Sequence, residues 1–381
     1  MPNEVRLGDV LKLERIAVQV DPEAEYRQIG IRSFGNGIFH RDPCLGSELS
    51  KLKYFEVRPG RLVVSNIMAW EGAIAVSTEV EDGFVGSARF LSYRPIGEVD
   101  LRYLNYFFQG DTGKTLIKSV STGTVTRNQT VSPKNFENAV VQLPDLPEQN
   151  RVADKLDGLL MQHGHATDEV PSPQTVRQLA AAGLERSLNR WADETIRVDQ
   201  VCSMVNDTVH PGGDLGQASE FVGLEHVVPH FGQRIGSRPL GDEKGRKFRF
   251  APGDILYGYL RPYLNKVWLA DRHGLCSVEQ YVLRPNGTMP AELIAAGLRS
   301  KSTLDKVLDA THNLQLPRLR SGLLMAMEIP VVPQKHQKQA MADVEEFNQQ
   351  IITLAERQRH RETLLTALRP ALLDAAFSGR L

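Results

Sequence analysis

Two stretches of the chain combine basic side chains, Lys and Arg in the first and His and Arg in the second, with short hydroxyl and amide side chains and contain no Asp or Glu. They span residues 112–136 and 310–327. Such side chains hydrogen-bond to phosphate oxygens and to base edges, so both stretches could bind nucleic acid, although an ordinary polar surface loop has the same composition. The candidate contacts are Lys114, Lys118, Ser121, Thr124, Thr126, Arg127, Asn128 and Lys134 in the first stretch, and His312, Asn313, Arg318 and Arg320 in the second.

Polar and aromatic clusters follow two Pro-Gly turns, at residues 59–60 and 252–253. In the major groove Arg can pair with guanine and Asn with adenine, whereas the aromatic rings could equally serve as core or rim packing. The candidates are Asn66 and Trp70 after the first turn, and Arg261, Tyr263, Asn265 and Lys266 after the second. A cationic run, made of Lys244, Arg246, Lys247 and Arg249, is a further candidate or else a solvated hairpin.

Familiar motifs for catalysis and metal binding are absent from the sequence. It contains no G-x-x-x-x-G-K-[ST] loop, no G-x-S-x-G turn, no Asn/Asp-Pro-Pro-aromatic run of an amino-methyltransferase and no paired cysteines at zinc spacing. His226 and His230 are four residues apart, but Pro229 between them forbids the helix that would align them. We therefore expect no catalytic residue, no metal site and no cofactor bound by this chain.

Length, charge and cysteine usage narrow the class of protein. The 381 residues favour two domains. The net charge of −1 provides no global basic field, so nucleic-acid binding would depend on local patches or on the charge of a partner. Three widely separated cysteines argue against a disulfide framework, and neither a signal peptide nor an 18-residue apolar run is present. These features predict a soluble cytoplasmic protein.

A faint internal repeat runs through the chain in a constant order. Each copy has an opening strand, a Pro-Gly turn before a β-prone run, a later strand ending in Arg-Pro, and a proline-flanked start of a helix. The matched segments are 5–7 and 196–198, 55–63 and 248–256, 90–95 and 281–285, and 143–147 and 329–333. The predicted parts are a first domain (1–146), a helical connector (147–192), a second domain (193–332) and a C-terminal long helix (333–381).

The elements that must position these domains are two helical segments with apolar residues at alternating steps of four and three, the spacing of a coiled-coil seam. The seam residues are Val152, Leu156 and Leu159 in the first segment, and Val344, Phe347, Ile351, Leu354, Leu365, Leu368 and Leu372 in the last. Pro171 and Pro173 should end the first helix, and Pro370 should kink or interrupt the last. Antiparallel packing would give the two domains a pseudo-twofold relation like the local twofold of duplex DNA.

Together these features resemble the specificity (S) subunits of Type I restriction–modification enzymes over the whole chain. The resemblance includes the opening Arg6-Leu7-Gly8-Asp9-Val10, the run 252–256, the helix start 143–149 and the ending 372–381. It implies an α+β fold with two similar β-rich target-recognition domains, separated by long antiparallel, coiled-coil-like helices in a pseudo-twofold internal repeat. Two departures are the start of the last helix, Pro333-Gln334-Lys335-His336-Gln337, and the prolines that shorten the first.

The resemblance also implies a function. It predicts a non-catalytic subunit that reads a bipartite double-stranded DNA site and docks two adenine-methyltransferase (M) subunits through its helices. In such a complex S-adenosylmethionine is bound by the M subunits, and ATP with Mg is used by a motor-nuclease (R) subunit where one is present. The alternatives left open by the residues are a helical adaptor or scaffold protein, and a nuclease with an unrecognised site.

Overall fold

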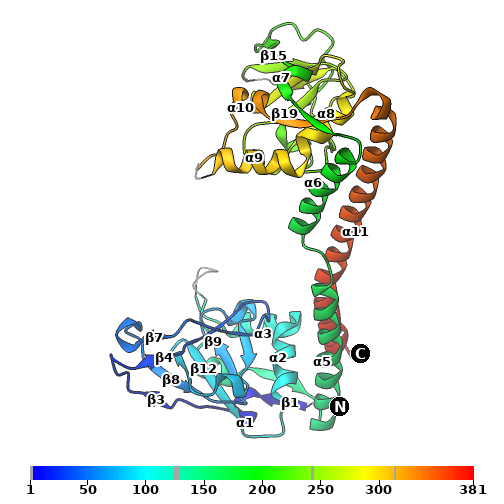
Figure 1. Ribbon diagram of the computed structural model, residues 1–381. Coiled ribbons are helices and arrows are strands. Elements are labelled where there is room, and N and C mark those ends of the chain that lie inside the picture. The colour runs from blue at the N-terminus through cyan, green and yellow to red at the C-terminus, as the bar shows by residue number, and fades with distance from the viewer. Residues whose placement is uncertain (1–2, 124–128, 242–243, 313–314) are drawn as a thin grey trace. The chain divides into compact units, whose positions relative to one another are not determined.

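The computed structural model describes residues 3–123, 129–241, 244–312 and 315–381. The chain forms two compact units. Unit 1 contains residues 1–169 and 362–381, and unit 2 contains residues 170–361. Each unit combines small β-sheets with helices (Figure 1), which confirms the predicted α+β class.

Unit 1 is organised around a four-stranded antiparallel sheet in the order β10-β9-β12-β2. A second sheet has the order β11-β8-β3, and β1 pairs with β13. The strands are β1 (Asn3–Arg6), β2 (Leu11–Leu13), β3 (Ala17–Val18), β4 (Glu25–Tyr26), β5 (Ile29–Ile31), β6 (Ile38–His40), β7 (Cys44–Leu45), β8 (Tyr54–Val57), β9 (Leu62–Ser65), β10 (Ile74–Val76), β11 (Phe84–Ser87), β12 (Phe90–Pro95) and β13 (Val140–Leu143). The helices are α1 (Leu7–Val10), α2 (Leu101–Gln109), α3 (Asp111–Val120), α4 (Pro133–Glu137) and α5 (Leu146–Asp168).

Unit 2 has the same plan, with a four-stranded sheet in the order β15-β22-β19-β20. Its second sheet is β16-β18-β21-β17, and β14 pairs with β23. The strands are β14 (Glu194–Arg197), β15 (Cys202–Val205), β16 (Thr208–Val209), β17 (Phe221–Val222), β18 (Lys247–Phe250), β19 (Ile255–Gly258), β20 (Val267–Leu269), β21 (Gly274–Cys276), β22 (Gln280–Pro285) and β23 (Glu328–Val331). The helices are α6 (Pro173–Asn189), α7 (Val198–Val201), α8 (Ala291–Arg299), α9 (Lys301–Thr311), α10 (Ser321–Ala326) and α11 (Gln337–Phe377), whose last part belongs to unit 1.

The predicted internal repeat is confirmed strand by strand. β2, β9, β10 and β12 of the first sheet correspond in chain order and pairing to β15, β19, β20 and β22 of the other. The opening strands β1 and β14 each pair antiparallel with the strand that precedes the long helix, β13 or β23. The helices α2 and α8 follow equivalent strands and have the same length of nine residues.

Each unit buries a core between its sheet, its short helices and one pair of long helices. In unit 1 the fully buried side chains of Tyr93, Leu104 and Phe108 belong to one cluster with Leu156 of α5 and Leu373 of α11. In unit 2 Leu184 of α6 and Val344 of α11 join the equivalent cluster. A buried Leu or Phe contributes about 1.5–3 kcal/mol, so these clusters fasten each domain to its helix pair.

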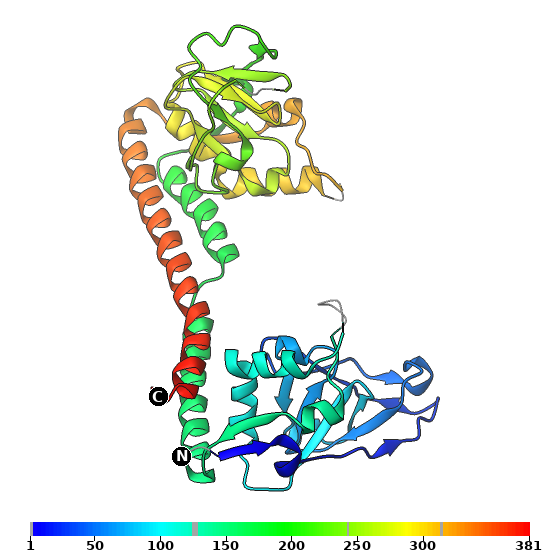
Figure 2. The same cartoon turned by 180° about the vertical axis from the view of Figure 1, so that it is seen from behind.

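The helix pairs are antiparallel within each unit. In unit 1 His163 of α5 lies beside Leu365 of α11, and Arg151 beside Leu381. In unit 2 Asp343 of α11 accepts hydrogen bonds from Arg190 and Trp191, which follow α6. Figures 1 and 2 show α5 beside the end of α11 and α6 beside its first part. As predicted, the first helix breaks near Pro171 and Pro173, because α5 ends at Asp168 and α6 begins at Pro173.

The structure corrects two details expected for α11, whereas a kink at Pro370 stays a prediction. An interruption at Pro370 is not present, because the helix continues through it; proline removes only one N–H donor there, and the next turn is held by the buried Leu373. Leu354 and Leu368 were predicted in the buried seam but are 37% and 40% exposed. Next to Ile351 the buried position is Ala355 instead of Leu354, since a straight α-helix repeats every 3.6 residues and a strict 3.5-residue pattern drifts around it.

A polar joint reinforces the apolar contact between each domain and α11. In unit 1 Arg369 of α11 donates to Gln109 Oε1 at 2.5 Å and to Gly35 O at 3.1 Å. In unit 2 Arg299, which ends α8 as Gln109 ends α2, donates to Asn348 Oδ1 of α11 at 3.5 Å. The guanidinium therefore comes from α11 in one unit and from the domain in the other.

Candidate nucleic-acid interface

The first basic stretch is held beside the polar turn that follows β9. Asn66 N donates to Arg89 O at 2.8 Å, and Val131 N donates to Asn66 O at 2.9 Å. These three residues, the Asn66 ladder, join segments that are far apart in the sequence. Thr122 and Thr130 exchange backbone hydrogen bonds of 2.8 and 2.9 Å, which brings together two positions within the stretch that are eight residues apart.

Unit 2 repeats this arrangement with different side chains. Tyr259 N donates to Glu279 O at 3.1 Å, and Leu319 N donates to Tyr259 O at 3.0 Å. These three residues form the Tyr259 ladder. Arg261 N also donates to Pro317 O at 2.9 Å, so the second basic stretch lies directly beside the cluster after the second Pro-Gly turn. In both units, two sequence features predicted separately are therefore neighbours.

Several candidate side chains of the two stretches face solvent. Lys118 on α3 and Lys134 on α4 are exposed, and Lys114 lies 3.8 Å from Asp111. The hydroxyl of Ser121 is occupied by Ile117 O at 2.7 Å. His312, Arg318 and Arg320 are exposed in unit 2. Thr124, Thr126, Arg127, Asn128 and Asn313 lie outside the described residues.

The cluster after the second Pro-Gly turn divides into exposed and internal side chains. Arg261 is exposed and Tyr263 is 41% exposed. Asn265 is only 2% exposed, has a left-handed φ of 47°, and donates to Arg299 O at 3.0 Å. The Lys266 amine donates to Leu224 O, and burial lowers its pKa. Asn265 and Lys266 thus hold backbone segments of their own domain.

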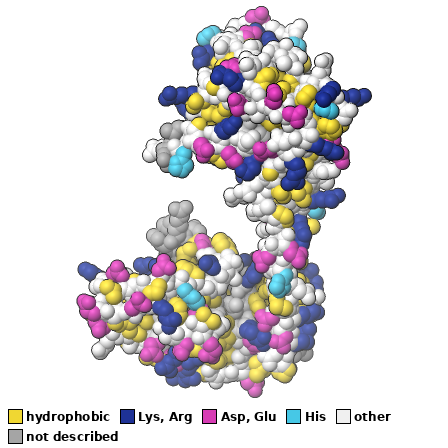
Figure 3. All heavy atoms as spheres, in the orientation of Figure 1, with side chains coloured by type: hydrophobic (Ala, Val, Ile, Leu, Met, Phe, Trp, Pro, Cys, Tyr) yellow, Lys and Arg dark blue, Asp and Glu magenta, His cyan; other side chains and the backbone are white. Residues whose placement is uncertain are grey.

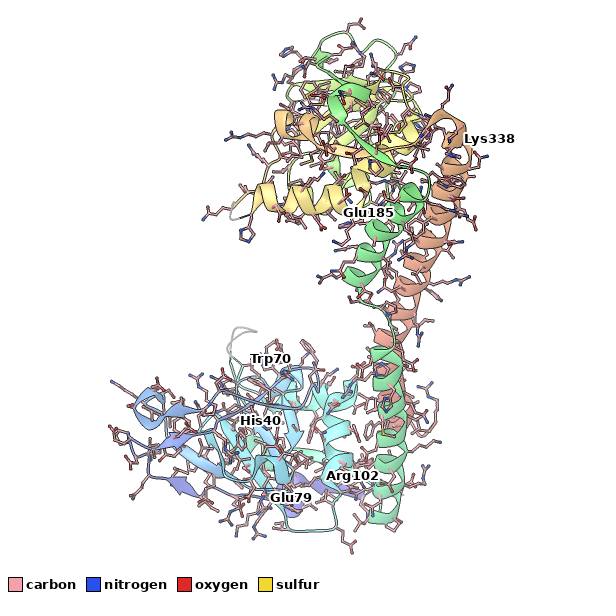
Figure 4. The ribbon with its side chains drawn as sticks, viewed as in Figure 1. His40, Trp70, Glu79, Arg102, Glu185 and Lys338 are labelled. Carbon is pink, nitrogen blue, oxygen red and sulfur yellow. The ribbon has the colours of Figure 1, made fainter. Side chains whose placement is uncertain are left out.

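The remaining candidates are also partly engaged within the fold. Trp70, labelled in Figure 4, is half-buried and donates from Nε1 to Ile67 O at 3.2 Å. Arg249 binds Asp207 at 2.8 Å and Asp214 O at 2.7 Å. The Lys247 amine donates to Gly245 O at 2.9 Å, whereas Lys244 and Arg246 are exposed. The cationic run belongs to β18 and the residues before it, in a different sheet from β19.

Sequence reasoning missed a cleft in unit 1 that adjoins the Asn66 ladder. Its volume is about 470 Å3, and its lining includes Gln28, Arg41, Ser50, Ser65, Ser87 and Arg89. Tyr54, also in the lining, has its hydroxyl 2.9 Å from Ser50 Oγ. Arg41 and Arg89 are both exposed. These residues come from strands and loops dispersed between positions 28 and 90, so no single stretch of sequence signals the cleft.

The surface charge of both units is mixed. On the face shown in Figure 3, Lys and Arg side chains are interspersed with Asp and Glu. This agrees with the net charge of −1, and it means that any electrostatic attraction of DNA is local.

The helix residues predicted to meet partners have two different environments. Val152, Leu156, Val344 and Ile351 are buried, and Leu159, Phe347, Leu365 and Leu372 are half-buried, within their own units. Leu354 and Leu368 are exposed, and so are Met161, Leu179 and Leu364, at 63%, 47% and 56%. Leu364 and Leu368 are one helical turn apart on α11, and neighbouring exposed apolar side chains of this kind are typical of protein–protein contact surfaces.

A charged cluster fixes α2 on α5 in unit 1. Arg102 binds Asp154 at 2.8 Å and Asp157 at 2.7 Å on α5, and Asp100 at 2.7 Å before α2 (Figure 4). The Tyr106 hydroxyl also donates to Asp157, and burial with this carboxylate raises the pKa of Tyr106. The cluster therefore helps to set how the first domain lies on its own helix.

Within the described ranges, no three His, Cys, Asp or Glu side chains gather closely enough to hold a metal ion. None of the helices in the part of the chain that the structure describes is both long and apolar enough to span a membrane.

Comparison with known proteins identifies similar chains. No protein-family model matches. The Type I restriction enzyme EcoDI specificity subunit of Escherichia coli is 22% identical over 284 residues, covering 63% of this chain and 62% of that protein. A chain from a structure of the type I R-M system, concerned with complex assembly and conformational transition, has a TM-score of 0.71 at 19% identity, covering 100% of this chain and 98% of its own.

The crystal structure of the HsdS subunit from Thermoanaerobacter tengcongensis has a TM-score of 0.60 at 19% identity, with coverage of 100% and 97%. The sequence match and the two structural matches agree with the repeat, the paired opening strands and the helix pairs described above. The chain therefore has the fold of the specificity subunits of Type I restriction–modification systems, and the resemblance expected from its sequence is confirmed.

Proposed function

We propose that this chain is the DNA sequence-recognition subunit of a Type I-like restriction–modification complex. In this proposal each unit binds one half of a bipartite double-stranded site through its ladder and the adjoining basic stretch. The observation that carries it is the repeat of these ladders: the same backbone hydrogen bonds present different side chains in the two units. One frame with two sets of side chains suits two domains that read different sequences.

The helices supply the second half of the proposal. The exposed leucines of α6 and α11 offer apolar contact to two adenine-methyltransferase (M) subunits, and to a motor-nuclease (R) subunit where the system restricts. This chain contributes recognition and no catalytic group. S-adenosylmethionine belongs to the M subunits, and ATP with Mg to the R subunit. The complex works on DNA in the cytoplasm.

The test is single-molecule sequencing of DNA from cells that express the neighbouring methyltransferase with or without this chain. We expect a bipartite adenine-methylation motif only when the chain is present. Replacing residues 1–142 with those of a chain of different specificity should change one half of the motif and leave the other. Methylation that is independent of the chain would refute the recognition role and favour an adaptor.

A further inference from the structure

The two ladders carry opposite charges at one equivalent position. Arg89 immediately precedes β12, and Glu279 immediately precedes β22. Each uses its carbonyl to accept the hydrogen bond that begins its ladder, from Asn66 N or from Tyr259 N. The backbone therefore places the two side chains at the same point of the repeated fold, although one is a cation and the other an anion.

The Arg89 side chain is available for a ligand. It is exposed at the rim of the cleft in unit 1, beside neutral hydrogen-bonding groups such as Gln28, Ser50 and Ser87. The acid that lines the same cleft, Glu48, has its Oε2 occupied by Leu45 N at 2.9 Å. Among the residues that the structure describes, no side chain forms an ion pair or a hydrogen bond with the Arg89 guanidinium.

Glu279 is half-buried, and its carboxylate has one weak hydrogen bond and no cationic partner among the described residues. Ser277 Oγ approaches Glu279 Oε2 at 3.5 Å, a long hydrogen bond, and Lys and Arg within the described ranges form no ion pair with it. Its neighbours are Tyr259 and Tyr281, whose rings stack at 4.5 Å. The Tyr281 hydroxyl donates to Leu319 O at 3.0 Å, which ties this group to the second basic stretch.

Because Arg89 and Glu279 carry opposite charges, the two equivalent positions cannot both bind a DNA phosphate. A carboxylate beside a phosphate is repelled, so the position of Glu279 does not suit the DNA backbone. A carboxylate does suit a base edge, because it accepts a hydrogen bond from N4 of cytosine, and Arg donates two hydrogen bonds to N7 and O6 of guanine. The backbone bonds of the ladders hold both residues near the stretches that carry the exposed cations, which would bind the phosphates on either side.

We propose that Arg89 and Glu279 are equivalent base-reading residues, with Arg89 selecting guanine in one half-site and Glu279 selecting cytosine in the other. The inference rests on the proposed recognition function and names the chemistry of one position in each half-site. A well-placed bidentate pair, such as Arg with guanine, discriminates against the wrong base by roughly 5- to 150-fold.

The test uses the complete chain with its methyltransferase and maps methylation by single-molecule sequencing. Arg89→Ala removes the donors to guanine and is expected to relax one guanine position in one half of the motif, and Glu279→Ala removes the acceptor and should relax one cytosine position in the other half. Arg58→Ala is the matched control, because Arg58 is also an exposed cation of unit 1 but pairs with Glu56 at 3.2 Å, outside the ladder. It should leave the motif unchanged, and thermal melting should show all three variants folded.

Three outcomes are informative. A relaxed position in the predicted half supports the proposal. An unchanged motif in both variants overturns the proposal. This holds whether methylation stays at the wild-type level or falls equally on all sequences, and an equal fall is what loss of a phosphate contact would produce. Titration of purified complex on duplexes at several salt concentrations separates these last two cases, because only a phosphate contact lowers the salt slope, by about 1. If methylation by the wild-type complex does not depend on this chain, the proposed recognition function is refuted, and the base-reading roles of Arg89 and Glu279 are refuted with it.

Discussion

Lowering the pH should destabilise unit 2 through a single buried histidine. His230 is 9% exposed, sits in a left-handed turn with φ of 69°, and has no described partner for Nδ1. Burial, with the nearby Arg177 guanidinium, lowers the pKa of His230 from 6.5 to about 4. As pH falls, the unfolded chain therefore binds a proton before the folded chain does. The stability from neutral His230 is complete above pH 6.5 and is lost progressively toward pH 4.

Between pH 7 and pH 5 the free energy of unfolding of unit 2 should fall by about 2 kcal/mol, because His230 binds a proton in the unfolded chain but not in the folded unit. For a unit of this size that corresponds to a melting temperature about 4–8 °C lower. Differential scanning calorimetry at both pH values measures it. His230→Asn tolerates the left-handed backbone and does not titrate, so it should remove the extra acid sensitivity. His210→Asn, at an exposed position, is the control. An unchanged pH dependence in His230→Asn would refute the reasoning.

Four other perturbations follow from the fold and the interface. Arg320→Ala should weaken DNA binding by the assembled complex by about 1–3 kcal/mol if Arg320 reads a base, and unaltered titration curves would remove it from the interface. Ile351 is 5% exposed, so Ile351→Asp should lower the free energy of unfolding, measured with denaturant, by several kcal/mol. Leu354 is 37% exposed, so Leu354→Asp should lower it by less than about 1 kcal/mol. Equal losses in the two variants would contradict the buried face described for α11. Leu364→Asp with Leu368→Asp should leave melting unchanged but reduce co-purification of M subunits, and full recovery would show that this face docks nothing. Gln109→Arg should lower the stability of unit 1 by facing Arg369 with a second guanidinium, and adding Arg369→Gln should restore it; simply additive losses would count against the polar joint.

Local sequence signals predicted those features that depend on local physics. The break between α5 and α6 follows from Pro171 and Pro173, because proline restricts the residue before it and lacks an N–H. The repeat was visible because its Pro-Gly turns and strands keep their order. The domain boundaries and the residues that contact DNA remain predictions.

Features that depend on strand register were not visible in the sequence. Arg89 and Asn66 are 23 residues apart, and only the pairing of β12 with β9 brings them together. The same limit applies to Asn265, which reads as a candidate base contact but is buried by its left-handed turn against Arg299. The apolar residues of α11 fit a 3.5-residue repeat and a 3.6-residue repeat about equally well over a few turns. Packing against α5 and α6 follows the 3.6-residue repeat.

The ladders explain how two such domains can diverge without losing their fold. Every bond that builds them joins backbone N–H to backbone O, at 2.8–3.1 Å, so the geometry is independent of side-chain identity. Asn66 and Tyr259 occupy the same place, and so do Arg89 and Glu279. If the fold depended on those side chains, replacing a cation by an anion would break it. Because it depends on the backbone, the base-contacting chemistry proposed for each unit is free to change one residue at a time while the basic stretch and the helix pair stay in place.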